Sequence, residues 1–138
     1  SILIRLHRNV SALDKKTADI AAKYKLTFSQ FMVLEALYSK GNLTVGEVRR
    51  AILSSVGTIS VIINNLVKME YIERLADEND RRVSILQLTD AGRDIISKIV
   101  PENNEMIRQS FEILKTEEKT ELVDILKKLG GHIYEKNN

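Results

Sequence analysis

The sequence contains no cysteine among its 138 residues. This absence excludes disulfide bonds, thiolate metal sites and sensing through cysteine oxidation by this chain. Long hydrophobic runs are missing too: none approaches the roughly 20 apolar residues of a membrane-spanning helix, and no secretory signal pattern opens the sequence. We therefore expect a cytoplasmic protein without a membrane partner.

Catalytic and metal-binding patterns are equally scarce. The two histidines, His7 and His132, show no ligand spacing to each other or to a carboxylate motif. Gly130 and Gly131 lack the lysine and serine that surround a phosphate-binding loop. The last segment carries acids that are typical of a solvated helix face, namely Glu117, Glu118, Glu121 and Asp124. The sequence thus predicts no enzyme, no metal site and no cofactor.

An excess of charge of one sign is also absent, because the formal net charge is only +2. Residues 1–26 hold six cations and two anions, a net charge of +4, whereas residues 44–93 hold seven of each. Residues 94–138 hold seven cations and nine anions, a net charge of −2. A nucleic-acid-binding protein with this balance has to rely on where its cations are placed. The 43% apolar share is sufficient for the core of one domain.

Two short helices are predicted near the middle of the chain. Thr44 and Glu47 form a capping-box pattern that starts the first helix, which ends near Ile52. The second helix begins at Ser54 or Ser55 and extends to about residue 69. Its core-facing residues recur at helical spacing: Ile59, Ile62, Ile63 and Leu66.

The side chains on the opposite face of the second helix are short and mostly uncharged. They belong to Thr58, Ser60, Val61, Asn64 and Asn65. The helix N-terminus also offers free backbone amides. A helix with this profile is suited to enter the major groove of DNA, where its first turns touch base edges and its end touches phosphates. We expect Val61 to contact a thymine methyl group.

A two-stranded hairpin follows this helix. Tyr71 to Ala76 and the β-branched stretch after Arg82 predict the strands, and a new helix begins at Thr89. The polar turn between the strands is Asp77-Glu78-Asn79-Asp80. Arg81 and Arg82 follow it at the tip, where guanidinium groups on a rigid arm suit phosphates and a narrow minor groove. We expect Arg81 to be tied to Asp77 or Asp80. An ordinary solvated hairpin is the alternative for the arginines alone, but the order of short helix, recognition-type helix and basic hairpin favours a winged helix-turn-helix.

Further helices are predicted on both sides of this unit. Residues 2–24 are helical, and Thr27 with Gln30 starts a helix that runs to about Ser39 and ends at Gly41 and Asn42. The residues of that helix at core spacing are Phe31, Leu34, Leu37 and Tyr38.

The helix after Thr89 is expected to kink or break at Pro101, because the proline ring removes a backbone hydrogen bond. A last helix begins near Thr116. One face of it is apolar, with Leu122, Ile125, Leu126, Leu129 and Ile133.

Across nearly its whole length the chain resembles the MarR-type transcriptional regulators. The matching segments are Leu43 to Val48, Ser55 to Leu66, Met69 to Arg74, Asp77, Asp80 to Arg82, and Leu88 to Gly92. One departure lies at Met69-Glu70-Tyr71, where the family usually has a glycine before the strand. We expect this departure to alter the turn geometry slightly without affecting the fold.

The resemblance implies a mainly α fold with a small β-hairpin wing. Residues 1–138 would form a single MarR-like domain, with a DNA-binding lobe at 27–93 and dimerisation helices at 1–26 and 94–138. In this family the first helix and the last two helices interlock with those of a partner subunit. The implied function is a transcriptional regulator, most often a repressor, that binds a pseudo-palindromic double-stranded DNA operator as a homodimer.

The DNA-contacting residues follow from the predicted helices and wing, with Arg50 and Arg74 also placed toward the nucleic acid. The set consists of Arg49, Ser54, Ser55, Thr58, Ser60, Val61, Asn64, Asn65, Lys68, Arg81 and Arg82. The resemblance gives Asp77 the role of bracing a wing arginine, and Asp80 supports the wing with it. A winged helix that binds proteins and not DNA is the alternative, and salt separates the two, because DNA binding weakens steeply as salt rises.

MarR-like regulators often release DNA when a small aromatic or phenolic molecule binds between the dimerisation helices and the DNA-binding lobe. With cysteine absent, such a ligand is the expected effector, and a constitutive or protein-controlled repressor is the alternative. The candidate ligand-binding residues are His7, Phe31, Glu35, Tyr38 and Met106. Phe31 and Tyr38 also sit at core spacing, so simple packing is the competing explanation for both.

Overall fold

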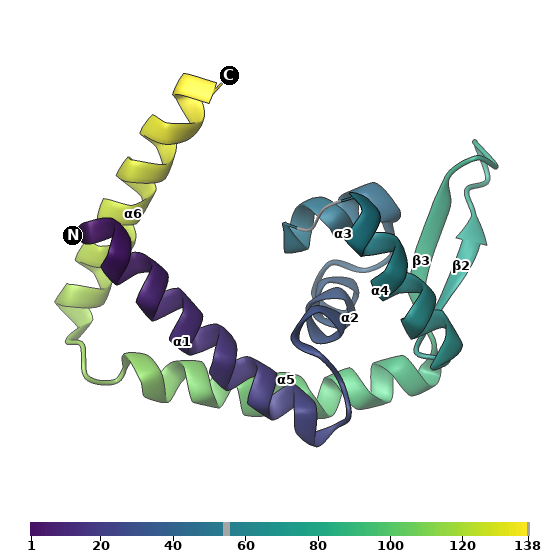
Figure 1. Cartoon of the computed structure of the whole chain (residues 1–138), viewed down its shortest axis with the longest axis horizontal. Coiled ribbons are helices and arrows are strands. Elements are labelled where there is room, and N and C mark those ends of the chain that lie inside the picture. Colours follow the sequence, from purple (N-terminus) through teal and green to yellow (C-terminus); the bar gives the residue numbers. More distant parts are fainter. Residues whose placement is uncertain (54–55, 138) are drawn as a thin grey trace. The chain divides into compact units, whose positions relative to one another are not determined.

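The computed structural model describes residues 1–53 and 56–137 of the chain. These residues form two compact units, Ser1–Asn104 and Glu105–Asn138. The elements are shown in Figure 1 and follow in the order α1 (Ile2–Lys23), α2 (Phe28–Lys40), β1 (Leu43–Thr44), α3 (Val45–Ile52), α4 (Val56–Lys68), β2 (Ile72–Ala76), β3 (Ser84–Leu88), α5 (Asp90–Phe111) and α6 (Thr116–Asn137). The predicted fold class, mainly helical with a small wing, is confirmed.

Both predicted capping boxes are present and fix where α2 and α3 begin. Thr27 Oγ1 accepts a hydrogen bond from the Gln30 amide at 3.1 Å, and the Gln30 side chain accepts one from the Thr27 amide at 2.9 Å. Thr44 and Glu47 form the same pair of bonds at the start of α3. Each box satisfies two backbone donors that a helix N-terminus leaves free.

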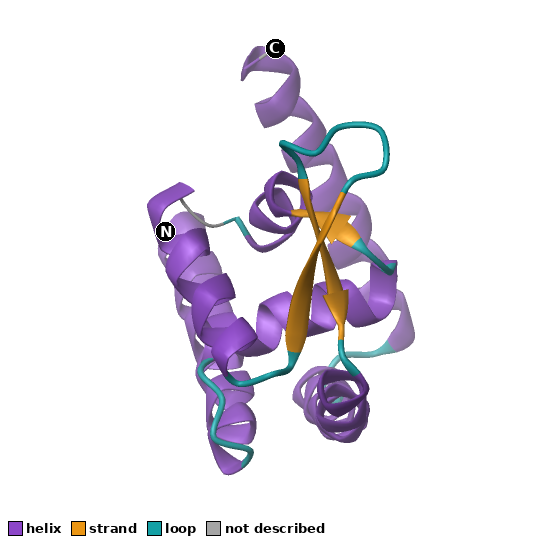
Figure 2. Cartoon of the chain, turned by 90° about the vertical axis from the view of Figure 1, so that its right-hand side faces the viewer, coloured by secondary structure: helices purple, strands orange, loops and turns teal. Residues whose placement is uncertain are grey.

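The wing is a twisted antiparallel ribbon, and a third strand accompanies it (Figure 2). β2 and β3 pair from Ile72 with Leu88 to Ala76 with Ser84, which confirms the predicted hairpin. β1 pairs with the other edge of β3, so that Leu43 lies opposite Leu86. This third strand is absent from the prediction, because two residues are too short to show the alternation of a strand.

The core of the first unit lies between α2, α4, α5 and the sheet. The apolar residues of α4 that were predicted to face inward are all buried. They pack in one cluster with residues from the other elements, including Leu34, Leu37, Ile72, Leu86, Ile96 and Ile99. Tyr38 is the exception among the predicted core residues of α2, because it is exposed and the Arg93 guanidinium lies 5.8 Å from its ring centroid. The core prediction for Tyr38 is therefore wrong.

The helix α5 runs through Pro101, so a break at this residue, one of the two predicted outcomes, is wrong, and a kink stays a prediction. Pro101 is exposed, whereas Ile96, Ile99 and Asn103 on the other face of α5 are buried. The Thr17 hydroxyl of α1 donates a hydrogen bond to Asn103 Oδ1 at 2.8 Å. These contacts on both sides of the proline offset the roughly 3 kcal/mol that a proline costs inside a helix.

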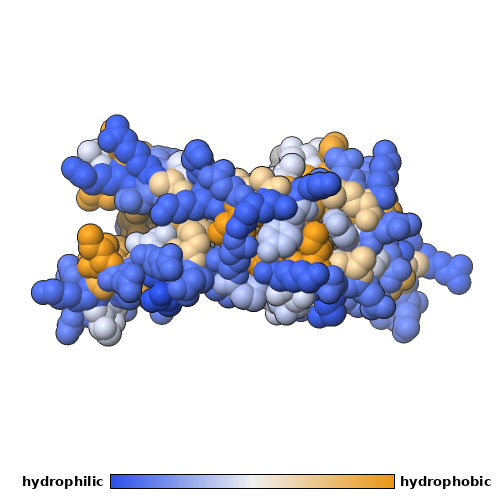
Figure 3. All heavy atoms as spheres, turned by 90° about the horizontal axis from the view of Figure 1, so that it is seen from below, coloured by the Kyte–Doolittle hydropathy of each residue, from blue (hydrophilic) through white to orange (hydrophobic). Residues whose placement is uncertain are grey.

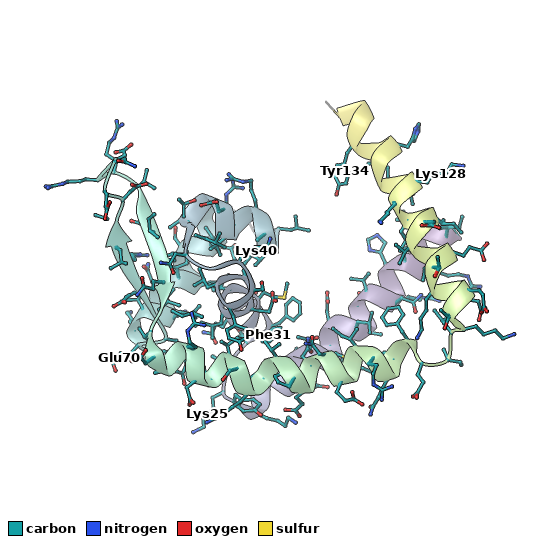
Figure 4. The ribbon with its side chains drawn as sticks, turned by 180° about the vertical axis from the view of Figure 1, so that it is seen from behind. Lys25, Phe31, Lys40, Glu70, Lys128 and Tyr134 are labelled. Atoms are coloured by element: carbon teal, nitrogen blue, oxygen red, sulfur yellow. The ribbon has the colours of Figure 1, made fainter. Side chains whose placement is uncertain are left out.

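The second unit comprises the end of α5 and the helix α6. Lys115 donates its amide to Glu118 Oε1 at 2.9 Å just before α6 begins, close to the predicted start near Thr116. Figure 4 shows Lys128 and Tyr134 projecting from α6. The predicted apolar face of this helix is exposed in the single chain.

Hydrophobic side chains also interrupt the hydrophilic surface in the view of Figure 3.

No single helix within the described ranges has the length and apolar character needed to cross a membrane. One bent pair, Val45–Ile52 with Gly57–Lys68, meets the criterion by length and composition only.

Candidate nucleic-acid interface

The helix α4 presents a polar, almost uncharged face to solvent. Its predicted outer residues are exposed from Thr58 to Lys68, and Val61, with 59% of its surface accessible, is the apolar member of this face. The inner residues of the same helix are at most 8% exposed. The predicted division of α4 into two faces is therefore confirmed. Ser54 and Ser55, the predicted first base-reading residues, lie outside the described residues.

The helix α3 precedes α4 and contributes cations near its end. Arg49 is half-buried and Arg50 is exposed. Hydrogen bonds from the backbone and side chain of Thr44 lower the pKa of Glu47, and the nearby charge of Arg50 acts in the same direction. Glu47 is thus held ionised at the positive end of the α3 dipole.

The tip of the wing is shaped by its two predicted support residues, Asp77 and Asp80. Asp77 Oδ1 accepts a hydrogen bond from the Asn79 backbone amide at 2.9 Å, which closes the polar turn locally. Asp80 accepts two hydrogen bonds from the Arg82 guanidinium, at 3.1 and 3.2 Å, and one from the Arg82 amide at 3.0 Å. The hydrogen bonds from Arg82 lower the pKa of Asp80.

The expected tie of Arg81 to Asp77 or Asp80 is therefore wrong for the described residues, because Asp80 pairs with Arg82 and Asp77 accepts a hydrogen bond from the Asn79 backbone. Arg82 nevertheless keeps a side chain that is 90% exposed. Asp80 and Arg82 are only two residues apart, so the backbone amide and the guanidinium of Arg82 both reach the Asp80 carboxylate. These bonds orient the Arg82 side chain.

The base of the wing is joined to α5 at Glu70, Tyr71 and Thr89. The Thr89 hydroxyl donates to the Glu70 carbonyl at 2.6 Å, and the Thr89 amide donates to the Tyr71 carbonyl at 3.1 Å. A side chain at Gly92 would overlap the Tyr71 carbonyl oxygen, so only glycine permits this approach. Glu70, labelled in Figure 4, has a φ of 62°, the left-handed conformation that favours glycine. It lies within Met69-Glu70-Tyr71, the segment in which the family resemblance places a glycine.

A hydrogen bond that the sequence did not predict connects α4 to the wing. The Arg74 guanidinium, on β2, donates to Asn64 Oδ1 at 2.5 Å. Both residues were placed toward DNA, but nothing in their spacing of ten residues indicates that they touch. The pairing of β2 with β3 brings Arg74 to α4, because it aligns Arg74 with the buried Leu86 on the face of the sheet that packs against the core.

The five predicted ligand-binding residues are spread over three helices. Phe31, Glu35 and Tyr38 share α2, His7 lies on α1 and Met106 on α5 in the second unit. Phe31, labelled in Figure 4, is only 2% exposed and belongs to the core cluster. Their joint role in binding a ligand stays a prediction. Within the part of the chain that the structure describes, no group of three or more His, Cys, Asp or Glu residues is arranged to hold a metal ion.

Comparison with known proteins agrees with this geometry. A family model described as transcriptional regulator SarA/Rot matches residues 15–99. The HTH-type transcriptional regulator MhqR of Bacillus subtilis (strain 168) is 32% identical over 129 residues, which cover 94% of this chain and 87% of MhqR. The transcriptional repressor MprA of Escherichia coli (strain K12) is 35% identical over 126 residues, which cover 90% of this chain and 71% of MprA.

Solved structures with the same fold include a MarR protein from Peptoclostridium difficile, with a TM-score of 0.86 and 22% identity over 98% of this chain and 88% of that protein. A mutant MarR from E. coli complexed with operator DNA gives a TM-score of 0.76 and 23% identity, covering 92% of this chain and 94% of MarR. NadR in complex with 4-hydroxyphenylacetate gives a TM-score of 0.80 and 26% identity, covering 94% of this chain and 92% of NadR.

The family match covers more than half of the chain, the relatives are regulators of transcription and not enzymes, and the helix and wing geometry is that of a winged helix. The chain therefore belongs to the winged helix-turn-helix transcriptional regulators of the SarA/Rot and MarR type, and it is a DNA-binding regulator.

Proposed function

We propose that this regulator is a repressor that binds a pseudo-palindromic operator as a homodimer. The observation that carries the proposal is the uncharged polar face of α4 beside a wing tipped with Arg81 and Arg82. Small polar side chains match the donors and acceptors of base edges, and arginines match phosphates and the minor groove. The base-reading role falls to Ser55, Thr58, Ser60 and Val61.

Dimerisation is supported by the exposed apolar face of α6. Leu122, Ile125, Leu126, Leu129 and Ile133 are each between 37% and 54% exposed in the single chain. Five large apolar side chains in one stripe are costly in water and are typical of a surface that a second subunit covers. Two-fold symmetry would place two recognition helices about one turn of DNA apart, roughly 34–36 Å. In this proposal residues 27–93 read the DNA, and residues 1–26 and 94–138 hold the dimer.

Repression and ligand control rest on the relatives. MprA is named a repressor, and NadR is solved with a phenolic acid. By analogy, a small aromatic or phenolic molecule would release this regulator from DNA through the predicted ligand residues. A ligand shifts the equilibrium between the DNA-binding state and the non-binding state only if it binds the second state more tightly. A hundredfold loss of DNA affinity requires the ligand's binding free energies to the two states to differ by roughly 2.7 kcal/mol. We propose a cytoplasmic location for this regulator.

A selection of duplexes from a random pool tests the DNA-binding proposal. We expect enrichment of a pseudo-palindrome whose half-sites are separated by about one helical turn, with affinity that falls steeply as salt rises. The alternative, a winged helix that binds proteins, predicts no enriched sequence and a weak dependence on salt.

Phenolic acids and quinone-like compounds then test the control step. A true effector lowers DNA affinity and, reciprocally, binds less well when the selected duplex is present. A compound that raises the thermal stability of the protein but leaves DNA affinity unchanged is an adventitious binder. A broad screen without a coupled compound would favour constitutive repression.

A further inference from the structure

Arg74 occupies the junction between the recognition helix and the wing. It lies on β2, in register with the buried Leu86, and its guanidinium reaches the exposed face of α4, where it donates to Asn64 Oδ1 at 2.5 Å. A guanidinium has five N–H donors, so the bond to Asn64 leaves the others free for a second acceptor. The side chains of Arg74 and Asn64 are both exposed, so an acceptor from another molecule can reach the guanidinium.

The charge of Arg74 is not neutralised by its surroundings. The neighbouring acid, Glu73, pairs in register with Gln87 on the opposite face of the ribbon and accepts a hydrogen bond from Gln87 Nε2 at 3.1 Å. Among the residues that the structure describes, no carboxylate forms an ion pair with Arg74. Arg82, by contrast, is paired with Asp80. Arg74 is thus held in place by a neutral amide, and its guanidinium has no carboxylate partner among the described residues.

DNA geometry indicates which group Arg74 meets. The major and minor grooves are separated by a sugar–phosphate backbone, so a protein with a helix in one groove and a wing in the next has that backbone between them. The Arg74–Asn64 bond joins β2 to α4, so it would lie beside that backbone if α4 and the wing occupy adjacent grooves.

We propose that Arg74 contacts a phosphate of the backbone that separates the two grooves, and that Asn64 is a positioning residue that holds the guanidinium toward it. This inference rests on the proposed binding of DNA by α4 and the wing. It sharpens the role of Asn64, which was predicted only as one of the DNA-contacting residues, because its side-chain amide oxygen serves Arg74. The pair therefore contributes affinity to every sequence and does not select among sequences.

The test uses the full chain with two duplexes of equal length, one that the intact chain selects from a random pool and one of random sequence. Arg74→Ala should weaken binding to both by about the same factor, roughly tenfold or more, and lower the salt slope by about one unit for each bound subunit. Asn64→Ala should weaken binding about two- to tenfold, the worth of one hydrogen bond, with the salt slope and the selected sequence unchanged. Arg74→Lys should behave like Asn64→Ala, because it keeps the charge but loses the planar donor.

Arg93→Ala is the matched control, because it removes one cation that faces Tyr38 and should leave affinity and slope unchanged. Melting temperatures check that each variant is folded, and if Arg74→Ala does not fold, the other two variants decide. An altered base preference in Asn64→Ala, or an unchanged salt slope in folded Arg74→Ala, would overturn this inference while the proposed function stands. An intact chain that binds neither duplex would overturn the proposed function itself.

Discussion

The helices α4 and α6 carry the same kind of apolar stripe but differ in what covers it. On α4 the stripe of Ile59, Ile62, Ile63 and Leu66 is at most 8% exposed, because the helix packs into the core of its own chain. On α6 the stripe from Leu122 to Ile133 is 37% to 54% exposed. Helical spacing predicted both stripes equally well, but it does not indicate whether the covering surface lies in the same chain.

The difference assigns opposite working faces to the two helices. In α4 the apolar face stabilises the fold, and the proposed function assigns the polar face to DNA. In α6 the polar face is solvated, and the proposed function assigns the exposed apolar face to a partner subunit. Substitutions on the two stripes should therefore change different measurements.

The largest effect is expected from Leu126→Asp on α6. In a two-fold interface each substitution occurs twice, once in each subunit. A central residue typically contributes about 2 kcal/mol of binding free energy, so the two substitutions together should raise the dimer dissociation constant about a thousandfold. Sedimentation at micromolar concentration should report monomers.

Lys128→Asp is the control for Leu126→Asp, because it places the same side chain on the opposite face of α6. It should leave the dimer intact. A dimer of unchanged affinity in Leu126→Asp would show that the α6 stripe is not the interface.

The next effect concerns the stripe of α4. Ile63→Ala should lower the free energy of unfolding by about 2–5 kcal/mol, because it leaves a cavity among fully buried residues. Val61→Ala, on the exposed face of the same helix, should change it by less than about 0.5 kcal/mol. Urea unfolding at one protein concentration measures both. Equal losses in the two variants would contradict the division of α4 into two faces.

The wing adds a charged contact beside the polar face of α4. Arg82→Ala should weaken DNA binding by about 1–3 kcal/mol and flatten the salt slope by about one unit for each phosphate contact that is lost. The Arg82 side chain is exposed and pairs only with Asp80 among the described residues, so the variant should lose DNA affinity without unfolding. Titrations at several salt concentrations decide this, and unchanged affinity and slope in a folded variant would remove the wing from the interface.

A smaller effect is expected at the base of the wing. Glu70→Gly should raise the free energy of unfolding by up to about 1 kcal/mol, because the left-handed conformation at a φ of 62° strains any residue with a side chain. Glu70→Ala retains that strain and should give no such gain. Thermal melts of the two variants compare them, and a less stable Glu70→Gly protein would mean that the Glu70 side chain stabilises the turn.

The smallest effect is a pH dependence from the α3 cap. Hydrogen bonds from Thr44 lower the pKa of Glu47 below its ordinary value of 4.5, so its contribution to stability is fully present above pH 4.5 and is lost as the pH falls through the lowered value. Glu47→Gln keeps a capping side chain that does not titrate. Its unfolding free energy should therefore fall less between pH 5 and pH 2 than that of the intact chain, and parallel curves would contradict this assignment.

Local signals made most of the fold predictable from the sequence. The capping boxes at Thr27 and Thr44, the polar turn at residues 77–80 and the stripe of α4 each depend on residues close in sequence. The strand β1 was missed, because its pairing with β3 joins residues more than 40 positions apart and leaves no periodic pattern. A break at Pro101 does not occur, because buried contacts on the inner face of α5 override the local cost of the proline.

The candidate site was predictable to the level of faces but not of contacts. Spacing places Asn64 on the outer face of α4, yet only the folded sheet brings Arg74 to it. The charge pattern predicted a bond between an arginine and an acid at the wing tip, but the partner of Asp80 is set by turn geometry and is Arg82. Tyr38 has core spacing but lies at the end of α2, where Arg93 meets it instead of the core.

We propose that the polar face of α4 meets DNA while the apolar face of α6 joins two chains. The mass of the complex formed on the selected duplex tests both parts in one measurement. We predict two chains on each duplex, with Leu126→Asp binding much more weakly and the insertion of half a helical turn, about 5 base pairs, between the half-sites abolishing tight binding. One chain that saturates the duplex, or binding that the insertion does not affect, would contradict the account.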